Sequence, residues 1–255
     1  MSIVDKIIDS FAKKLGTGLY SAFSKYFRNS RIIHSFWKLS NENARLHSYI
    51  TNTDYVMKNE FNAPLFNRED AIAQGLAVAE FERLFSFKKT ADYSVAPKHF
   101  KQNDTGVMDD LILLGGPVYN SISGAILTDT ACSYRNIYFD SAANRDLHFK
   151  DDDGAPQVLQ PVNNGRGYFT DYGIIVNVGN PWSKGHRVIG LMGCNGLGTY
   201  AAAKYLHSGK YRETMSKVKK ADEYVIIVKC KGLWENEHLQ VMPESIVLER
   251  VLKLK

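Results

Sequence analysis

The feature that most constrains the fold is an apolar run that ends in a cluster of glycines and leads into an alanine-rich helix. The run covers residues 188–192, the cluster holds Gly193, Gly196 and Gly198, and the helical pattern covers residues 199–207. Glycines let the backbone approach a neighbour closely, and the free N–H groups at a helix start attract anions. The segment predicts a strand, a tight loop and a helix, with an anion-binding position at the loop.

The spacing of these glycines leaves two interpretations open. It reads Gly-x-x-Gly-x-Gly, which differs from the dinucleotide fingerprint, and no Lys-Ser or Lys-Thr pair completes a phosphate-binding loop. The structural alternative is a tight strand-to-helix turn in which Ala201, Ala202 and Ala203 pack close to a sheet.

A second glycine loop follows another apolar run, at residues 111–114, and a helix over residues 122–127 is expected after it, capped by Asn120 and Ser121. A continuous apolar run favours a strand buried on both faces, as in a parallel sheet. The carboxyl ends of parallel strands share one edge, where ligands of open α/β sheets bind. The predicted ligand-binding residues of the two loops are Gly115, Gly116, Asn120, Asn195, Gly196, Gly198 and Thr199. A purely structural role for both loops stays open.

A third predicted strand, at residues 173–178, is followed by Asn180, Pro181 and Trp182. An asparagine amide can read a base or a sugar hydroxyl, and an indole can stack on a base, so we add Asn180 and Trp182 to the predicted ligand-binding residues. A turn started by Asn-Pro explains the same residues.

The alternation of strands and helices predicts an α/β fold, with a mostly parallel, Rossmann-like three-layer sheet and an N-terminal helical extension. Residues 1–50 form the predicted extension and residues 51–255 the Rossmann-like domain. Residues 144–167 are polar and rich in Asp, Asn and Gly, which favours a long loop or a hairpin and makes them our candidate for a lid. The other expected elements are strands at 92–97, 135–139, 224–229 and 245–251, and a helix at 69–86.

The strand, the glycine cluster and Gly198-Thr199 before the alanine-rich helix resemble the nucleotide-phosphate loops of Rossmannoid proteins, and the lysine-decarboxylase-like group in particular. In that group a Pro-Gly-Gly-x-Gly-Thr turn is followed by a catalytic Glu. Here Cys194 and Asn195 stand in the leading positions, and Ala202 or Ala203 occupies the acidic one. The resemblance implies nucleotide binding, whereas the acid of the family's phosphoribohydrolase chemistry is missing.

The N-terminal extension is basic. Apolar residues recur at helical spacing over residues 3–27, and a second helical segment is expected at 36–50. No acidic residue lies between Asp9 and Glu42, a stretch that holds Lys13, Lys14, Lys25, Arg28, Arg31 and Lys38. This pattern is typical of a helix that docks to a membrane surface or a protein partner, and equally of one that packs on the protein's own core. Nucleic-acid binding ranks last, because no recognition motif accompanies the charge.

The spacing of the cysteines and of the acidic residues argues against a metal site. Cys132, Cys194 and Cys230 include no Cys-x-x-Cys pair, and the run 151–153 lacks the spacing of a calcium loop. Cys194 is either a small loop residue or a nucleophile that needs a histidine such as His186. Without an apolar leader or a spanning stretch, we expect a cytoplasmic protein, at most peripheral to a membrane.

The predicted function is binding of a nucleotide-related phosphate- or ribose-bearing small molecule at the glycine loops, as a sensor or effector in signalling. Hydrolysis stays open, and Glu60, Glu69, Asp70 and Asp171 are unplaced carboxylates that it would need. No catalytic residue or cofactor is assigned, and a homo-oligomer is left open. The alternative is an interaction module docked through residues 1–50.

Overall fold

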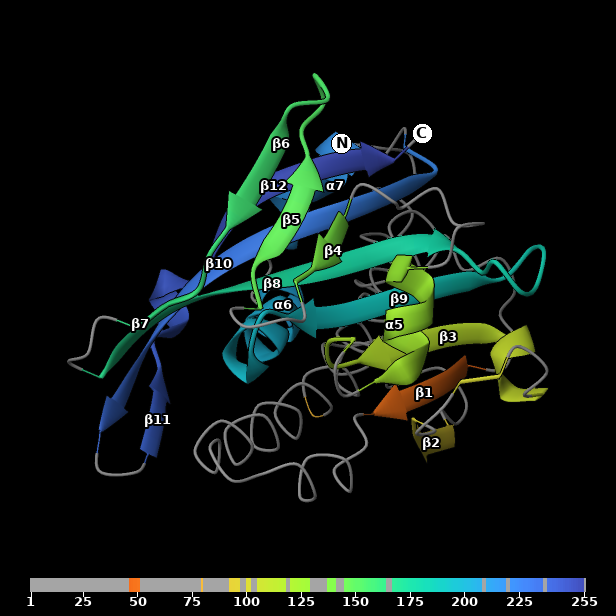
Figure 1. Ribbon diagram of the computed structural model, residues 1–255, viewed down its shortest axis with the longest axis horizontal. Coiled ribbons are helices and arrows are strands. Elements are labelled where there is room, and N and C mark those ends of the chain that lie inside the picture. The colour runs from red at the N-terminus through yellow and green to blue at the C-terminus, as the bar shows by residue number, and fades with distance from the viewer. Residues whose placement is uncertain are drawn as a thin grey trace, which may run out of the picture. The chain divides into compact units, whose positions relative to one another are not determined.

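The computed structural model (Figure 1) describes residues 46–50, 79, 92–96, 100–101, 105–117, 120–128, 137–140, 145–163, 167–207, 210–218, 221–235 and 238–254. The chain divides into two compact units, Met1–Leu39 and Ser40–Lys255, and every described residue belongs to the second. The predicted basic helix therefore lies outside the described residues. So does the helix predicted at 69–86, apart from Ala79, which is helical.

One half of the main sheet is parallel. It contains β1 (Leu46–Ile50), β2 (Asp92–Val95), β3 (Asp110–Leu114) and β9 (Arg187–Gly193) in the spatial order β2-β1-β3-β9. Each neighbouring pair runs in the same direction. All five residues of β3 are buried, as its apolar run predicts for a central strand. The sequence order of the strands reverses between β1 and β3.

The other half of the main sheet is antiparallel. β8 (Tyr168–Gly179) pairs with β9 and with β10 (Glu223–Glu235), and both pairings are antiparallel. β10 also pairs with β11 (His238–Val241) and β12 (Val247–Leu254), and β8 pairs with β7 (Val162–Asn163). Figure 1 shows the long strands β8 and β10 running on past β9 toward β7 and β11.

The expected mostly parallel, Rossmann-like three-layer fold is therefore wrong. Among the described residues, strands hold about twice as many residues as helices, and the main sheet is mixed. Apolar runs identify buried strands but not their direction. The short turn at 180–186 joins β8 directly to β9, and so short a connection suits antiparallel strands, whereas parallel strands need a long crossover.

The polar segment at 144–167 forms most of a second, three-stranded antiparallel sheet. β4 (Ile137–Phe139) pairs with β5 (Leu147–Lys150), and β5 pairs with β6 (Pro156–Leu159). The acidic run lies at the β5–β6 turn, where the N–H of Gly154, at φ 84°, donates to the carbonyl of Asp151. Of our two alternatives for this segment, the hairpin is correct, and its role as a lid stays a prediction.

The structure describes three α-helices: α5 (Ser121–Thr128), α6 (Gly196–His207) and α7 (Tyr211–Val218). α5 and α6 were predicted within a few residues, whereas α7 was not, and neither were the 3-10 helices η2 (Thr105–Met108) and η3 (Pro243–Ser245). The helical segment expected at 36–50 is wrong over Leu46–Ile50, which is the strand β1. Its remaining residues lie outside the described part.

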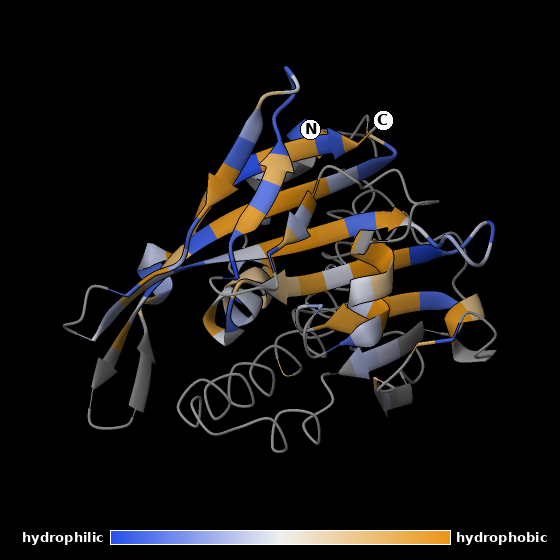
Figure 2. Cartoon of the chain, in the orientation of Figure 1, coloured by the Kyte–Doolittle hydropathy of each residue, from blue (hydrophilic) through white to orange (hydrophobic). Residues whose placement is uncertain are grey.

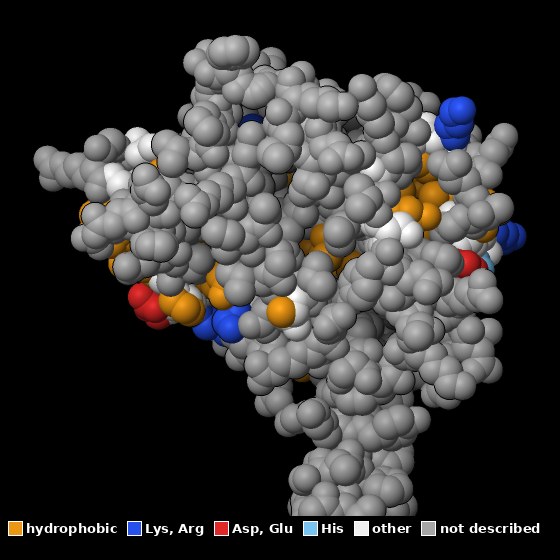
Figure 3. Space-filling model, turned by 90° about the horizontal axis from the view of Figure 1, so that it is seen from below, with side chains coloured by type: hydrophobic (Ala, Val, Ile, Leu, Met, Phe, Trp, Pro, Cys, Tyr) orange, Lys and Arg blue, Asp and Glu red, His pale blue; other side chains and the backbone are white. Residues whose placement is uncertain are grey.

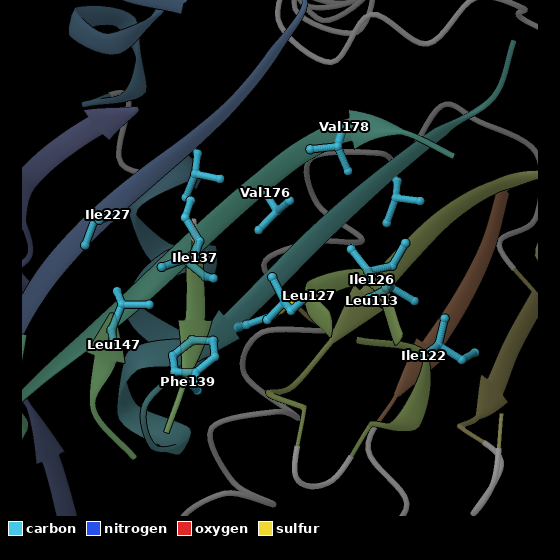
Figure 4. Close-up of a cluster of buried hydrophobic side chains, with 14 of the residues drawn as sticks. Leu113, Ile122, Ile126, Leu127, Ile137, Phe139, Leu147, Val176, Val178 and Ile227 are labelled. Atoms are coloured by element: carbon cyan, nitrogen blue, oxygen red, sulfur yellow. The ribbon is translucent and has the colours of Figure 1, made fainter. Parts of the chain in front are cut away.

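The two faces of the main sheet are covered differently, and within the described part neither carries the row of helices that a Rossmann-like fold has. Alternate residues of β8, such as Val176 and Val178, join Ile137, Leu147 and Leu127 in one core beneath α5 and the small sheet (Figure 4). The intervening residues of β8 face α6, which packs across β8, β9 and β10. In Figure 2 the hydrophobic colour follows β3, β8 and β9, and the hydrophilic colour gathers at the turns after β5 and β8.

Candidate functional site

The two glycine loops lie side by side, at the edge of the sheet where the parallel strands β3 and β9 end. The N–H of Gly115, at φ 96°, donates to the carbonyl of Leu191 at 3.0 Å. A Cβ atom on Gly116 would lie 3.1 Å from the carbonyl oxygen of Gly193. The loops are thus in contact through backbone, and a side chain on Gly116 would crowd the second loop.

Asn120 is fully engaged inside the protein. Its Nδ2 donates to the carbonyls of Tyr49 and Leu114, both at 3.1 Å, and its Oδ1 accepts the N–H groups of Ile122 and Ser123, also at 3.1 Å. Both amide hydrogens and the amide oxygen are therefore used. Asn120 caps α5 as predicted and also ties the ends of β1 and β3 together, so it offers no group to a ligand.

The predicted anion position at the start of α6 is occupied by the chain's own carboxylate. Asp171, on β8 and 2% exposed, accepts the N–H of Gly198 on Oδ2 at 2.7 Å and the N–H of Tyr172 on Oδ1 at 2.9 Å. Asn195 Nδ2 approaches Oδ1 at 3.4 Å. A negative side chain stabilises a helix N-terminus. A bound phosphate would have to displace this one.

Close packing accounts for the glycines around α6. A Cβ atom on Gly198 would overlap the carbonyl of Tyr172, one on Gly193 would overlap the N–H of Thr199, and one on Gly173 would overlap the carbonyl of Gly198. Glycine is required so that the first turn of α6 can lie directly on β8 and β9. The structural alternative for this loop therefore fits the geometry.

Gly196 and Thr199, two further residues predicted from this loop, are part of α6. Gly196 is its first residue and is buried, and Thr199 is buried with its N–H donating to the carbonyl of Asn195 at 3.2 Å. Asn195 itself is half-buried. Of the residues that the sequence suggested in this loop, Asn195 is the one whose side chain is partly exposed.

Burial sets the protonation behaviour of the groups under α6. It raises the pKa of Asp171 to about 6, against the opposing effect of the N–H groups that donate to the carboxylate. Burial also raises the pKa of the Cys194 thiol well above its usual range, and the charges of Asp171 and Asp146 raise it further. Cys230, whose Sγ donates to the carbonyl of Asp171, is likewise kept as a thiol by burial.

These thiols are not activated nucleophiles. A reactive cysteine needs a lowered pKa and a base within reach. His186 precedes β9 whereas Cys194 follows it, so the two residues lie at opposite ends of that strand. The pairing of Cys194 with His186 that the sequence left open is not formed.

Asn180 and Trp182 lie at the opposite edge of the sheet from the glycine loops, because β8 runs antiparallel to β9. Asn180 Nδ2 donates to the carbonyls of Val107 and Asp109, both at 2.8 Å, and its Oδ1 accepts the N–H of Trp182. The indole of Trp182 packs on Phe100, with ring centroids 4.5 Å apart. The structure does not bring these two residues to the predicted site.

Arg145 and Asp146, which the sequence did not suggest, add two charged side chains near the second glycine loop. Arg145 Nη1 donates to Asn195 Oδ1 at 3.0 Å, and Gln160 Nε2 donates to Asp146 Oδ2 at 2.7 Å. Asp146 is 6% exposed, and within the described part its Oδ1 has no hydrogen-bond partner. We call Arg145, Asp146 and Asn195 the rim cluster.

Arg145 is the one non-glycine residue of the described part with a positive φ, at 53°. Such a conformation is uncommon for a residue with a side chain, and strain of this kind tends to gather at functional sites. Neither the backbone angle nor the contact with Asn195, 50 residues further on, leaves a signal in the sequence.

Within the described residues, no group of three His, Cys, Asp or Glu side chains is arranged to hold a metal ion. The acidic turn has local roles instead. Asp151 pairs with Arg250 at 3.0 Å, and Asp153 accepts the N–H of Ala155. Glu60, Glu69 and Asp70 lie outside the described residues.

No protein-family model matches the chain, and no curated protein matches its sequence. The resemblance to the lysine-decarboxylase-like group therefore stays a prediction. Of the helices that the structure describes, none is long and apolar enough to cross a membrane. Basic, acidic and hydrophobic side chains all appear among the described residues in the view of Figure 3, so they form no patch of one charge there.

Proposed function

We propose that the protein binds a small, ribose-bearing molecule related to nucleotides, and that the rim cluster holds the sugar. The observation that carries this proposal is the carboxylate of Asp146, which is almost fully buried and has one oxygen without a partner in the described part. A buried acceptor left unsatisfied costs roughly 1–3 kcal/mol, and more when it is charged. A hydroxyl donor from a ligand would remove that cost.

The neighbours of Asp146 suit a sugar. Arg145 supplies a guanidinium and Asn195 an amide, and these two side chains contact each other at 3.0 Å. Ribose hydroxyls both donate and accept, so a carboxylate matches them when guanidinium and amide N–H groups belong to the same cluster. Ligand sites commonly pair a few convergent polar groups of this kind with an otherwise preformed scaffold.

The same geometry favours the ribose over the phosphate as the part that is recognised. Asp171 already fills the start of α6, and its carboxylate would repel a second anion at Gly198. Asp146 adds a second buried carboxyl near the same loop, since its charge acts on Cys194. The ligand is therefore held beside the glycine loops by side chains, and the glycines of the second loop serve to pack α6.

The arrangement supports binding more than turnover. Both oxygens of Asp171 accept N–H groups from the chain, so that acid is committed to holding α6 and Asn195. Hydrolysis of a glycosidic bond normally needs a positioned acid and base. The alternative of an interaction module stays a prediction, because residues 1–45 lie outside the described part.

Isothermal titration calorimetry of the full chain with adenosine, guanosine, cytidine and uridine tests the proposal. Asp146→Asn should weaken binding by about tenfold or more, since it removes the charged acceptor. Asp152→Asn is the matched control, because it makes the same change on the exposed tip of the same hairpin. If the folded wild-type chain binds no nucleoside, or if Asp146→Asn binds as well as Asp152→Asn, the proposal is wrong.

A further inference from the structure

Asp146 lies next to a row of side chains on the outer face of the small sheet, formed by Tyr138, His148 and Val158. The inner face of that sheet carries Ile137 and Leu147, which are buried in the core beneath it (Figure 4). Residues alternate between faces along a strand, so Tyr138 and His148 point to the outer face. They are directly paired across β4 and β5, and His148 is paired in turn with Val158 of β6.

Two of these outer side chains form a stacked pair of rings. The centroids of Tyr138 and His148 are 4.7 Å apart and their planes differ by 3°. Tyr138 is nevertheless 47% exposed, as is Val158. An exposed, ordered aromatic pair on a sheet is the kind of surface on which the bases of single-stranded nucleic acids stack.

The row also carries a second buried polar atom without a partner. His148 Nε2, like Asp146 Oδ1, makes no hydrogen bond to the rest of the described chain. Residues two apart on a strand share a face and lie about 7 Å from each other. Asp146 directly precedes β5, and its carbonyl accepts the N–H of Asp140 at 2.8 Å, so the strand pairing extends to it. The alternation therefore places its carboxylate on the same side of the small sheet as the His148 ring.

We propose that Tyr138 and His148 form the platform for the planar base of the nucleoside whose ribose Asp146 binds. The inference rests on the proposed function and names the substrate class of the same site, a nucleoside rather than a bare sugar phosphate. The spacing matches such a ligand, because a base and the hydroxyls of its ribose are separated by a similar distance. The base lies on the face of the Tyr138 ring that is turned away from His148, and His148 supports that ring from its other side.

A ligand that reaches Oδ2 of Asp146 has to displace one exposed side chain. Gln160 covers the carboxylate of Asp146 through its 2.7 Å hydrogen bond to Oδ2, and Gln160 is exposed at the end of the β6 segment. Exposed side chains change rotamer within nanoseconds, so the movement presents no barrier to binding. Two neighbouring ribose hydroxyls can then donate to the carboxylate, one in place of Gln160 at Oδ2 and the other to the unpartnered Oδ1.

Two ligands that differ only in the base test the platform. Adenosine carries the base, and methyl β-ribofuranoside is the same sugar without it. Tyr138→Ala should weaken adenosine binding about tenfold to a hundredfold, the range expected for the loss of one stacked aromatic ring, and leave ribofuranoside binding unchanged. Tyr168→Ala is the matched control, because Tyr168 is also 47% exposed but lies on β8.

The outcomes distinguish the base platform at Tyr138 and His148 from the ribose site at Asp146. Adenosine binding that is lost in Asp146→Asn but kept in Tyr138→Ala would overturn the platform and leave the ribose site standing. Binding that depends on neither residue, or no nucleoside binding by the folded wild-type chain, would overturn both. His148→Leu removes the second ring of the pair and gives an independent readout, with a loss comparable to that of Tyr138→Ala expected.

Discussion

The carboxylate of Asp171 on β8 accepts a 2.7 Å hydrogen bond from the backbone N–H of Gly198 in the first turn of α6. The helix start thereby carries its own anion, and the pKa of that carboxyl is raised by burial from 3.8 to about 6. The same contact explains why a phosphate is not expected at this position and how the stability of the fold depends on pH.

The raised pKa of Asp171 predicts a loss of stability as the pH rises from about 4 to 6. The folded state binds the proton more tightly than the unfolded state, so this contribution is complete below pH 3.8 and is lost as the pH passes 6. A shift of this size corresponds to about 3 kcal/mol. The difference in unfolding free energy between wild type and Asp171→Asn, measured in urea from pH 3.5 to 7, should fall by that order. A flat difference would contradict the assignment.

Gly198→Ala should destabilise the protein by roughly 2 kcal/mol or more, because the new Cβ would overlap the carbonyl of Tyr172. Gly154→Ala is the contrast: nothing lies within 4 Å of its Cβ position, and the cost is only that of a residue with a side chain at φ 84°, about 1 kcal/mol. Urea unfolding of both variants measures the two effects. Equal losses would show that α6 is not held against β8 as described.

The sequence predicted the strands well where apolar runs were unbroken, as at Leu111 and Val188, since burial on both faces is a local signal. It did not predict the direction of β8, which depends on a turn short enough to double back. It also missed Asp171 as the partner of Gly198, because the two are brought together by pairing between β8 and β9 rather than by spacing along the chain. Asn120 was placed as a helix cap, but its two bonds to β1 and β3 follow from the sheet order.

Asn120→Ala should cost roughly 2–4 kcal/mol, because it removes a helix cap and the two buried hydrogen bonds that Nδ2 donates to the carbonyls of Tyr49 and Leu114. Asn120→Asp separates the two roles. The carboxylate can still accept the N–H groups of Ile122 and Ser123, but it cannot donate to the strand carbonyls. Thermal unfolding should therefore rank wild type above Asn120→Asp and Asn120→Asp above Asn120→Ala. An aspartate variant as stable as wild type would rule out the clamp.

Two N-terminal deletions that end at different residues should differ sharply in whether the remaining chain folds. Removing residues 1–39 ends at the boundary between the two compact units and leaves β1 intact. Removing residues 1–50 deletes β1, which lies between β2 and β3 and pairs with both. We expect the first chain to unfold cooperatively on heating and the second to be insoluble or to lack a transition. A deletion of 1–50 that folds normally would show that β1 is dispensable to the sheet.

Arg145 allows binding and stability to be separated at one position. Its φ of 53° strains any residue with a Cβ, so Arg145→Gly should be about 1 kcal/mol more stable than Arg145→Ala in urea unfolding. Both variants lack the guanidinium that contacts Asn195, so both should lose nucleoside affinity to the same extent in calorimetry. If Arg145→Gly binds the nucleoside more tightly than Arg145→Ala, in parallel with its greater stability, Arg145 acts on the fold alone. Equal affinity losses with unequal stabilities would place the guanidinium in the ligand site, because relief of backbone strain cannot restore a missing donor.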